Sequence, residues 1–546
     1  MNVMKLNWLR KAVSIAAVPA LAGAMLTGCG SGASASGSTT ATASDTQAEE
    51  TTTVQTTQST ADASSDSTDD DIEVWTTNNG FKAVEHGSQT YEFYKKLLGV
   101  GVVQPYVEWN GGQTYLEQLN LRIAAGDMPD IFTPVQGVEI DLIRSGALLD
   151  LTDLLPEKAP HLWNSIPQEV WDAVKASDPT GNDRIYSVPT VITYGRNGAM
   201  IRKDWLDKLG LEMPATQEEF VNVLKAFKEK DPNGNGMPDE IPTGGRAEAR
   251  WMSQLFGQYG IAIWEGYPQF DLYDGQLTYS AVTKNMRDCL QWMSELYKQG
   301  LLDPETLLND KAAWDGKINS GVVGCWEHIP QECYNYAENI YSATGEKPEI
   351  AVLPAISAPG YEGFYTEKQM NGSTFVLAKT DDETKIDREM KILDAFGNQD
   401  LWMDFYNGVE GMHSQKVDGK LVRLPDDPST QENLIFTPYN NIATIDFQID
   451  SLTSQLTDDR SWSVQQAIDG VQELQKYVKT YAGDGLPDSI YEDYPDIQNR
   501  TLYVEYASKI ITGEYPIEKF DEFVDQWNRS GGEEVTKRAR EWYTNK

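Results

Sequence analysis

One loop of the sequence has oxygen-bearing side chains at a spacing that suits a hard metal ion. It spans residues 231–242, and Asp or Asn occupies its first, third, fifth and ninth positions, with glycine at the sixth. This pattern matches most of a calcium-binding EF-hand loop, in which the seventh position supplies a backbone carbonyl. The expected ligands are Asp231, Asn233, Asn235, the carbonyl of Met237, Asp239 and Glu240.

The loop departs from the EF-hand at its twelfth position, where Pro242 stands in place of the bidentate glutamate. Glu240, at the tenth position, must therefore supply that carboxylate. The alternative is an ordinary turn without a metal, because Asn, Gly and Pro dominate turns. We predict a structural calcium ion here, since nothing in the loop indicates a calcium sensor.

A second group of aromatic and polar side chains follows the predicted strands, where open α/β sheets bind their ligands. Aromatic rings and planar polar groups together can hold a small polar ligand. The candidates are Trp75, Asn78, Asp130, Tyr194, Arg196, Asn197, Trp264, Trp326, Glu327, His328, Glu410 and His413. For each, the alternative is a half-buried residue that only packs the protein. Adjacent strand residues point to opposite faces, which argues against Glu327 and His328 as an acid–base pair.

Alternating strands and helices must position these residues. Apolar spacing predicts strands at 72–76, 130–132 and 184–189, and helices at 91–98, 115–125 and 202–210, the last closed by Gly210. Thr216 and Glu219 form a capping-box pattern at the start of a further helix. Asp-Gly pairs at 274–275 and 418–419 predict hairpin turns. This succession predicts an α/β fold with largely parallel sheets.

The N-terminus has the layout of a bacterial lipoprotein signal, which would occupy residues 1–28. Lys5, Arg10 and Lys11 precede an apolar run, residues 12–25, that is too short to span a bilayer as a helix. The run ends in a Leu-Thr-Gly-Cys sequence that resembles a lipobox, so Cys29 would become the lipidated first residue. The alternative is an ordinary signal peptide beside an incidental cysteine.

The chain is strongly acidic, with 83 Asp and Glu against 45 Lys and Arg and a formal net charge of −38 over 546 residues. Part of the acidity lies in residues 29–71, a Ser/Thr-rich segment without aromatic residues that we expect to be a disordered tether. The charge argues against nucleic-acid binding and against anionic membrane surfaces. Membrane contact would therefore come only through a lipid on Cys29. Cys325 and Cys333 are the nearest cysteine pair, and we expect no disulfide bridge between them.

Several short segments, taken in order, resemble the extracellular solute-binding lipoproteins of bacterial ABC importers. The resemblance is to the carbohydrate-binding subclass that carries a calcium loop, and it rests on residues 128–131, 185–189, 201–210, 231–242, 408–411 and 513–543. It implies the two-lobe, type II fold of periplasmic binding proteins such as maltose-binding protein. Each lobe would be a mostly parallel sheet flanked by helices.

The same resemblance implies that each lobe is discontinuous in sequence. The N-lobe would contain residues 72–192 and about 371–410, and the C-lobe about 193–370 and 411–546. The chain would cross between the lobes near residues 188–193, 370–377 and 406–413. The calcium ion would be held by the loop described above.

The implied function is a monomeric, lipid-anchored receptor on the outer face of the cell membrane, in a bacterium of Gram-positive type. It would capture an oligosaccharide between its lobes and deliver it unchanged to an ABC transporter permease. The sequence has no GxSxG, HExxH or phosphate-binding GxxxxGK[ST] motif, in keeping with a binding protein. The alternatives are a secreted carbohydrate-active hydrolase or lyase, a binding protein for a solute such as a peptide, and an adhesin without a small ligand.

Overall fold

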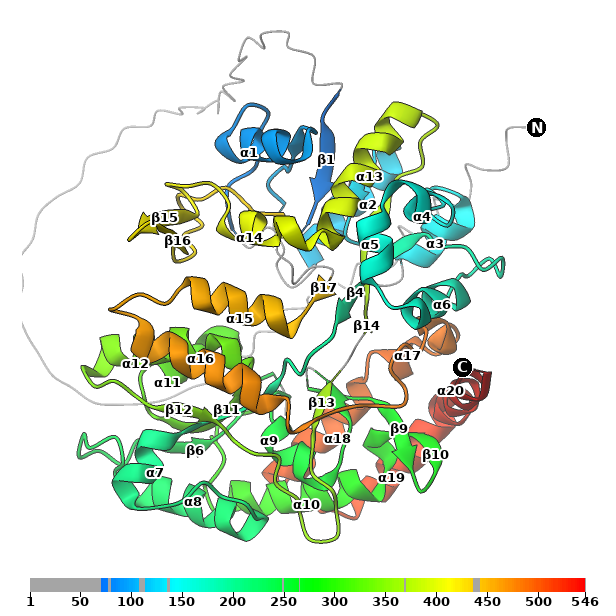
Figure 1. The fold of residues 1–546 in the computed structure, drawn as a ribbon. Helices are drawn as coiled ribbons and strands as arrows, with labels where there is room; N and C mark the ends of the chain where they lie inside the picture. The colour runs from blue at the N-terminus through cyan, green and yellow to red at the C-terminus, as the bar shows by residue number, and fades with distance from the viewer. Residues whose placement is uncertain are drawn as a thin grey trace, which may run out of the picture. The chain divides into compact units, whose positions relative to one another are not determined.

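Two larger β-sheets organise the protein, one of six strands and one of four (Figure 1). The computed structural model describes residues 70–545 except 77–79, 108–112, 135–137, 248–249, 265, 368–369 and 436–441. The predicted signal peptide, Cys29, the tether as far as residue 69 and the candidate ligand residue Asn78 lie outside the described residues. Within that part of the chain, no helix has both the length and the apolar character needed to cross a membrane.

The six-stranded sheet is the centre of the first lobe. In spatial order its strands are β17 (Ile442–Ala443), β4 (Ser187–Ile192), β14 (Met370–Leu377), β3 (Ile131–Phe132), β1 (Ile72–Trp75) and β2 (Val102–Val103). All of them run in one direction except β14, which is antiparallel to both of its neighbours. The prediction of a largely parallel sheet is therefore confirmed for this lobe.

Helices cover both faces of this sheet because successive strand residues point to opposite sides. Val74 and Ile131 lie in one apolar cluster, and their neighbours Trp75 and Phe132 lie in another. The first cluster includes residues of α1 (Gln89–Leu98), α4 (Leu154–Lys158), α5 (Pro160–Ser165), α6 (Gln168–Ala176), α13 (Glu383–Gly397) and α14 (Gln399–Asn407). The second includes residues of α2 (Gln113–Ala125) and α3 (Val138–Ser145).

The four-stranded sheet is the centre of the second lobe. In spatial order its strands are β12 (Ile350–Val352), β5 (Gly198–Arg202), β11 (Val323–His328) and β6 (Ile241–Thr243). Here β5 is the strand that runs against the others. Three of the four strands share a direction, but only the pairing of β11 with β6 is parallel.

Two helical layers enclose this second sheet as well. Ile201 and Cys325 face one cluster, whereas Met200 and Trp326 face the other. Residues of the first come from α7 (Lys203–Leu209), α8 (Gln217–Glu229), α9 (Ser253–Phe256), α10 (Lys284–Lys298), α17 (Pro495–Gln498), α18 (Thr501–Thr512), α19 (Lys519–Trp527) and α20 (Glu533–Asn545). Residues of the second come from α11 (Lys311–Asn319), α12 (Cys333–Thr344), α15 (Ile445–Ser454) and α16 (Ser461–Leu474). Cys289, Cys325 and Cys333 are free, buried thiols.

Three local sequence patterns, a capping box and two Asp-Gly turns, have the structures predicted for them. Thr216 and Glu219 make the reciprocal hydrogen bonds of a capping box at the start of α8. Asp274 and Asp418 have φ angles of 51°, and each is followed by a glycine with positive φ, as a two-residue hairpin turn requires. The resulting hairpins pair β9 (Phe270–Tyr273) with β10 (Gln276–Tyr279) and β15 (Ser414–Val417) with β16 (Lys420–Arg423). The remaining small pairs are β7 (Ile263–Trp264) with β8 (Tyr267–Pro268) and β13 (Tyr365–Glu367) with β18 (Val478–Thr480).

The paired strands β4 and β14 connect the lobes. Ser187 of β4 and Phe132 of β3 both pair with Val376 of β14, so the rest of β4 extends past the end of β3. From Ile192 the chain passes to β5 of the second sheet, and β14 returns from β13, which pairs with β18. Residues 188–193 and 370–377, which the sequence suggests as crossings, overlap β4 and β14.

The third connection between the lobes lies later in the chain than residues 406–413, where the sequence places it. Ile442 pairs with Val191 in the first sheet, and the Ile435 backbone N–H donates to the Tyr94 hydroxyl of α1 at 3.0 Å. Leu434, Ile435 and Ile442 all belong to the first-lobe core. The described part of 411–443 therefore belongs with the first lobe, and the chain enters the second through α15.

Candidate functional site

The antiparallel pairing of β5 with β11 brings two distant parts of the sequence to one edge of the second sheet. Glu327 pairs with Ala199, and His328 pairs with Gly198. Because β5 begins where β11 ends, Arg196 and the buried Asn197, which precede β5, lie beside His328. The sequence analysis expected all four side chains to be ligand contacts, and the structure gathers them at this edge.

Strand β6 reaches the same edge, since it runs parallel to β11. It continues through two glycines to Arg246, whose guanidinium carbon lies 4.2 Å from the centre of the Trp251 ring and 5.2 Å from that of Trp314. The His328 ring lies 5.7 Å from Trp314 and 5.4 Å from Tyr336, centre to centre. We call Arg246, Trp251, Trp314, His328 and Tyr336 the Arg246 cluster. Only His328 was found from the sequence.

Several polar atoms at this edge are buried without a hydrogen-bond partner among the described residues. They are Nε of Arg196, Nε of Arg246, Nδ1 of His328 and Nε1 of Trp264. Most buried polar groups in proteins are hydrogen-bonded, and leaving one unpaired costs about 1–3 kcal/mol. Nitrogen groups that lack partners beside aromatic rings are typical of a site that a polar ligand completes.

Burial controls the charge of the two basic groups in the Arg246 cluster. It lowers the pKa of His328 to about 4, with a further contribution from the positive charge of Lys311. The imidazole is therefore neutral at physiological pH. Burial also lowers the pKa of the Arg246 guanidinium, against the opposing effect of Asp315 and other anionic groups. The guanidinium stays charged, because the pKa of arginine in water lies far above physiological pH.

Two further candidates lie where the chain crosses between the lobes. Tyr194 and Trp264 share a small apolar cluster with Ile192 and Ala443. The Tyr194 hydroxyl donates to Oε1 of Gln331 at 3.4 Å. Both rings are almost fully buried, at 5% exposed. The two rings pack against the chain where it crosses between the lobes. The Trp264 indole N–H has no partner among the described residues and could donate to a ligand.

Trp326 lies deeper than the other candidates. Its side chain is fully buried in the second-lobe core, at an edge-to-face angle to Tyr336. Glu327 is also buried, and its Oε2 accepts the Ser253 backbone N–H at 2.6 Å. Trp326 supports the Arg246 cluster from the core that it shares with Trp314 and Tyr336, whereas Glu327 faces the other side of the sheet.

Two candidates of the first lobe have structural contacts instead. The indole N–H of Trp75 donates to Oε1 of Glu73 at 2.6 Å, and its ring packs against Tyr115 in the core. Asp130 lies before the first residue of β3, at the amino end of the strand and not at its carboxyl end. It accepts the Glu73 backbone N–H at 2.9 Å and pairs with Lys385.

Glu410 and His413 are not brought to the Arg246 cluster either. Glu410 is exposed and forms an ion pair with Lys416 at 2.9 Å. Both ring nitrogens of His413 are used within the protein, because Nδ1 accepts the Val409 N–H at 3.2 Å and Nε2 donates to the Glu432 carbonyl at 2.7 Å. Its burial also lowers its pKa. His413 therefore links the segments before and after the β15–β16 hairpin through Val409 and Glu432.

The loop expected to bind calcium has the turn geometry of such a loop. The Gly236 N–H donates to Oδ2 of Asp231 at 3.0 Å, and the Met237 N–H donates to Oδ1 of Asn235 at 2.7 Å. Oε1 of Glu240 is buried and has no partner among the described residues. Burial and the nearby charges of Asp231 and Asp239 raise the pKa of Glu240.

These oxygens are of the right type for calcium but are not arranged around a common point. The amide NH₂ groups of Asn233 and Asn235 donate to the Asp239 carboxylate at 2.9–3.2 Å. Within the described residues, no three His, Cys, Asp or Glu side chains are grouped as metal ligands. A cation would need both amides turned so that their oxygens face it, and it would relieve the repulsion among the three carboxylates.

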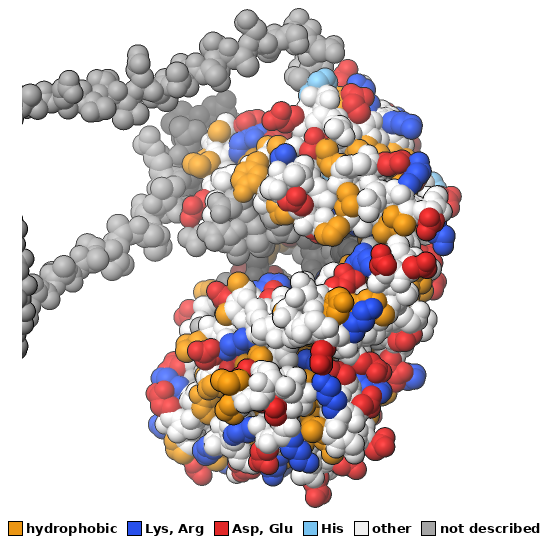
Figure 2. Space-filling view, turned by 90° about the vertical axis from the view of Figure 1, so that its left-hand side faces the viewer, with side chains coloured by type: hydrophobic (Ala, Val, Ile, Leu, Met, Phe, Trp, Pro, Cys, Tyr) orange, Lys and Arg blue, Asp and Glu red, His pale blue; other side chains and the backbone are white. Residues whose placement is uncertain are grey.

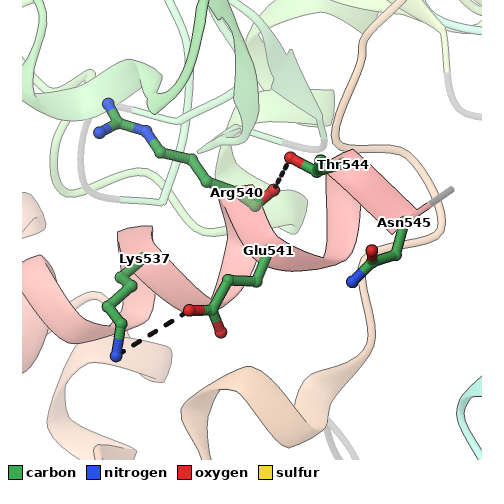
Figure 3. Close-up of a pocket in the computed structure, with 5 residues that line it drawn as sticks. All are labelled: Lys537, Arg540, Glu541, Thr544 and Asn545. Atoms are coloured by element: carbon green, nitrogen blue, oxygen red, sulfur yellow. Dashed lines mark hydrogen bonds and ion pairs between the residues drawn. The ribbon is translucent and has the colours of Figure 1, made fainter.

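Two hollows in the surface differ in the residues that line them. A cavity of about 530 Å³ is lined by residues of both lobes, among them Tyr186, Pro189, Phe270 and Arg500. Figure 2 shows that the surface is hollowed between the two lobes. A shallower hollow lies along α20, where Lys537 pairs with Glu541 and the Thr544 hydroxyl donates to the Arg540 carbonyl (Figure 3). The Arg540 guanidinium in this hollow donates through Nε to the Leu277 carbonyl of β10 at 2.8 Å.

Comparison with known proteins identifies the family. The model of the bacterial extracellular solute-binding proteins matches residues 47–387. The chain belongs to this family. Members of the family bind solutes outside the cell and are not enzymes, which removes the hydrolase and lyase alternatives. The described residues contain the two lobes that the resemblance implies.

Named relatives of this solute-binding protein include lipoproteins and sugar-binding proteins. Lipoprotein LipO of Bacillus subtilis is 25% identical over 448 residues, which are 80% of this chain and 86% of LipO. The fructooligosaccharide ABC transporter substrate-binding protein FusA of Streptococcus pneumoniae is 29% identical over 272 residues, which are 46% of this chain and 48% of FusA.

Solved structures share the fold. The alginate-binding protein AlgQ2, solved without calcium ion, has a TM-score of 0.65 at 19% identity and covers 87% of this chain and 97% of its own. FusA in complex with kestose has a TM-score of 0.62 at 20% identity and covers 87% of this chain and 99% of its own. At these identities the likeness establishes the two-lobe architecture and nothing about the ligand.

Proposed function

We propose that this solute-binding protein captures an oligosaccharide at the Arg246 cluster and delivers it to an ABC transporter permease. One observation carries the proposal: aromatic rings surround unpartnered nitrogen groups at the sheet edge beside the lobe crossings. Sugars present flat C–H faces that stack on aromatic rings, and hydroxyls that accept from planar donors. The name of FusA, a relative by sequence, supports the same ligand class.

The proposal is tested by thermal shift of the full-length protein against a panel of neutral and acidic oligosaccharides, with peptides as the contrasting class. A glycan at about 100 times its dissociation constant should stabilise the native state by about 2.7 kcal/mol. Chromatography of the bound glycan should recover it unchanged. Stabilisation by peptides and by no glycan would overturn the proposal.

Delivery and location are further parts of the proposal. We expect a monomer, held on the outer face of the membrane through a diacylglyceryl group on Cys29, as the name of LipO supports. Metabolic labelling with a fatty acid should mark the protein and should not mark a Cys29→Ala variant. Deletion of the partner permease should abolish growth on the glycan that the protein binds.

A structural calcium ion in the 231–242 loop completes the proposal. The ligands would be the side chains of Asp231, Asn233, Asn235, Asp239 and Glu240 and the carbonyl of Met237. The buried, unpartnered oxygen of Glu240 and the mutual repulsion of three carboxylates support a cation here. Such an ion would stabilise the turn after α8 and take no part in ligand binding.

A further inference from the structure

Arginines in this acidic protein are generally paired with carboxylates. Arg122 pairs with Glu73 at 3.0 Å, and Arg202 pairs with Asp204 at 2.7 Å. Other arginines with a carboxylate partner are Arg144, Arg184, Arg287, Arg388, Arg423, Arg460 and Arg538. Because Asp and Glu outnumber Lys and Arg by 83 to 45, the surroundings of an arginine without such a partner are informative.

The described arginines that form no ion pair with a described carboxylate fall into two groups. Arg529 and Arg540 lie near the C-terminus, where each donates through Nε to a backbone carbonyl. The others are Arg196, Arg246, Arg250 and Arg500, and three of these lie over aromatic rings of the second lobe.

The second group is held together by specific contacts. Arg250 and Arg500 lie over the Tyr267 ring, with guanidinium carbons 4.5 Å and 4.6 Å from its centre. Arg246 and Arg250 exchange two backbone hydrogen bonds of 3.2 Å. A Cβ on Gly266 would lie 2.3 Å from Cβ of Arg250, so only glycine lets the β7–β8 turn pack this closely. These contacts fix Arg246, Arg250 and Arg500 in place, and none of the three forms an ion pair with a described carboxylate.

The described carboxylates nearest Arg246 form no ion pair with it and have other partners. Asp315 is bound by Lys311 and by the Tyr336 hydroxyl, which donates to it at 3.1 Å. Glu327 accepts the Ser253 N–H. Stacking on aromatic rings orients a guanidinium and strips part of its water but leaves its charge unbalanced. Such a guanidinium can bind an anionic group of a ligand. A carboxylate suits it best, because its two oxygens can accept two parallel hydrogen bonds from the planar guanidinium.

We propose that the oligosaccharide bound by this protein carries carboxylate groups, as a chain of uronic acid units does, and that Arg246 binds one of them. Arg250, Arg196 and Arg500 provide positive charge for further acidic units. The inference rests on the proposed saccharide-binding function and names its ligand class. The net charge of −38 does not oppose it, because physiological salt screens charges beyond about 8 Å.

The test compares each acidic ligand with a neutral ligand of the same shape. Isothermal titration of the full-length protein is run with oligogalacturonates and with oligomannuronates, each beside its methyl ester, and with neutral fructooligosaccharides. We expect the free acid to bind at least about tenfold more tightly than its ester, since a hydrogen bond from a guanidinium to an ionised carboxylate is stronger than one to a neutral ester. Affinity for the acid should fall as salt is raised. Sulfated oligosaccharides distinguish carboxylate recognition from recognition of any anion.

Variants assign the effect to the site. Arg246→Gln should lower affinity for the acid about tenfold and leave affinity for the ester nearly unchanged. Arg540→Gln, which removes an arginine without an ion pair on α20, should leave both unchanged. If Arg246→Gln does not fold, Arg250→Gln and the salt dependence of the wild type give the same comparison.

The outcomes separate two claims: that the protein binds a saccharide, and that this saccharide carries carboxylates. Tighter binding of the esters or of fructooligosaccharides overturns the acidic ligand class and leaves saccharide binding standing. Preference for sulfated over carboxylated ligands overturns the carboxylate assignment. Binding of peptides and of no saccharide overturns both.

Discussion

His328 and Gly198 face each other across the antiparallel strands β11 and β5 of the second sheet. This pairing explains why the end of β11 and the start of β5 share one edge. Since β5 directly follows the crossing from β4, the same pairing places the Arg246 cluster beside the connection between the lobes. A strand that runs against its neighbours thus brings the binding edge and the lobe crossing together.

Substitutions of Trp251 should separate its backbone strain from its contact with Arg246. Trp251 has a φ of 58°, a left-handed conformation that is rare for a bulky side chain and that recurs at functional sites. Trp251→Gly and Trp251→Ala both remove the ring beneath Arg246, so both should weaken glycan binding about tenfold. The glycine variant should be more stable than the alanine variant by about 1 kcal/mol, because only glycine adopts positive φ without strain.

Titration calorimetry measures the affinities of the two Trp251 variants, and urea denaturation measures their free energies of unfolding. Wild-type affinity in both variants would show that the Trp251 ring takes no part in the site. Equal stability of the two variants would show that residue 251 is not strained.

Much of the fold can be predicted because its signals are local. The capping box of Thr216 and Glu219 and the Asp-Gly turns depend on neighbouring residues, and they form as expected. The third lobe crossing has no such signal. Its strand, β17, has two residues and is defined by pairing with β4, far away in sequence. Periodicity cannot detect an element of that length.

The candidate site could be predicted only where it follows a recognisable strand. His328 and Arg196 adjoin β11 and β5, whose apolar runs can be read from the sequence. Arg246 follows a three-residue strand, and its partners Trp251 and Trp314 are defined only by tertiary contact. Asp130 directly precedes β3 and so lies at the amino end of that strand, whereas ligands of open α/β sheets lie beyond the carboxyl ends of strands.

Calcium should stabilise the protein through the 231–242 loop. A chelator should lower the melting temperature by several degrees, because an ion at about 100 times its dissociation constant contributes about 2.7 kcal/mol. Asp231→Ala should remove this sensitivity. Asp274→Ala is the matched control, since Asp274 shares the positive φ of Asp231 but lies in a plain hairpin. Calorimetry with and without chelator makes the comparison, and equal sensitivity of Asp231→Ala and the wild type would contradict the calcium site.

His328 should make the protein less stable in mild acid. Its pKa is about 4 in the folded protein and 6.5 as an ordinary value, so the unfolded chain takes up a proton first as the pH falls. The stability that the neutral imidazole provides is complete above pH 6.5 and is lost as the pH falls toward 4. Between pH 7 and 5 the loss should be about 2 kcal/mol.

The matched comparison for His328 uses glutamine, which keeps a polar side chain but does not titrate. His328→Gln should lose less stability than the wild type between pH 7 and 5, whereas substitution of the exposed His161 should change little. Urea denaturation at the two pH values gives the free energies. An identical loss in His328→Gln and the wild type would show that another group causes the acid sensitivity.

Glu389 should have the opposite pH dependence. Its side chain on α13 is fully buried, and neither carboxyl oxygen has a partner among the described residues. Burial, followed by the negative charge of Asp130, raises its pKa to about 8, above the ordinary 4.5. The folded protein therefore keeps a proton that the unfolded chain releases. The stability that this provides is complete below pH 4.5 and is lost as the pH rises through 8.

Glu389→Gln tests this because the amide has nearly the same shape and stays neutral. The variant should match the wild type near pH 5 and exceed its free energy of unfolding by about 4 kcal/mol at pH 9. Glu410→Gln, at an exposed carboxylate, should change stability by less than about 0.5 kcal/mol at both pH values. Urea denaturation at pH 5 and 9 measures the differences. A constant difference between Glu389→Gln and the wild type would mean that Glu389 is ionised throughout and has a partner that the described contacts do not include.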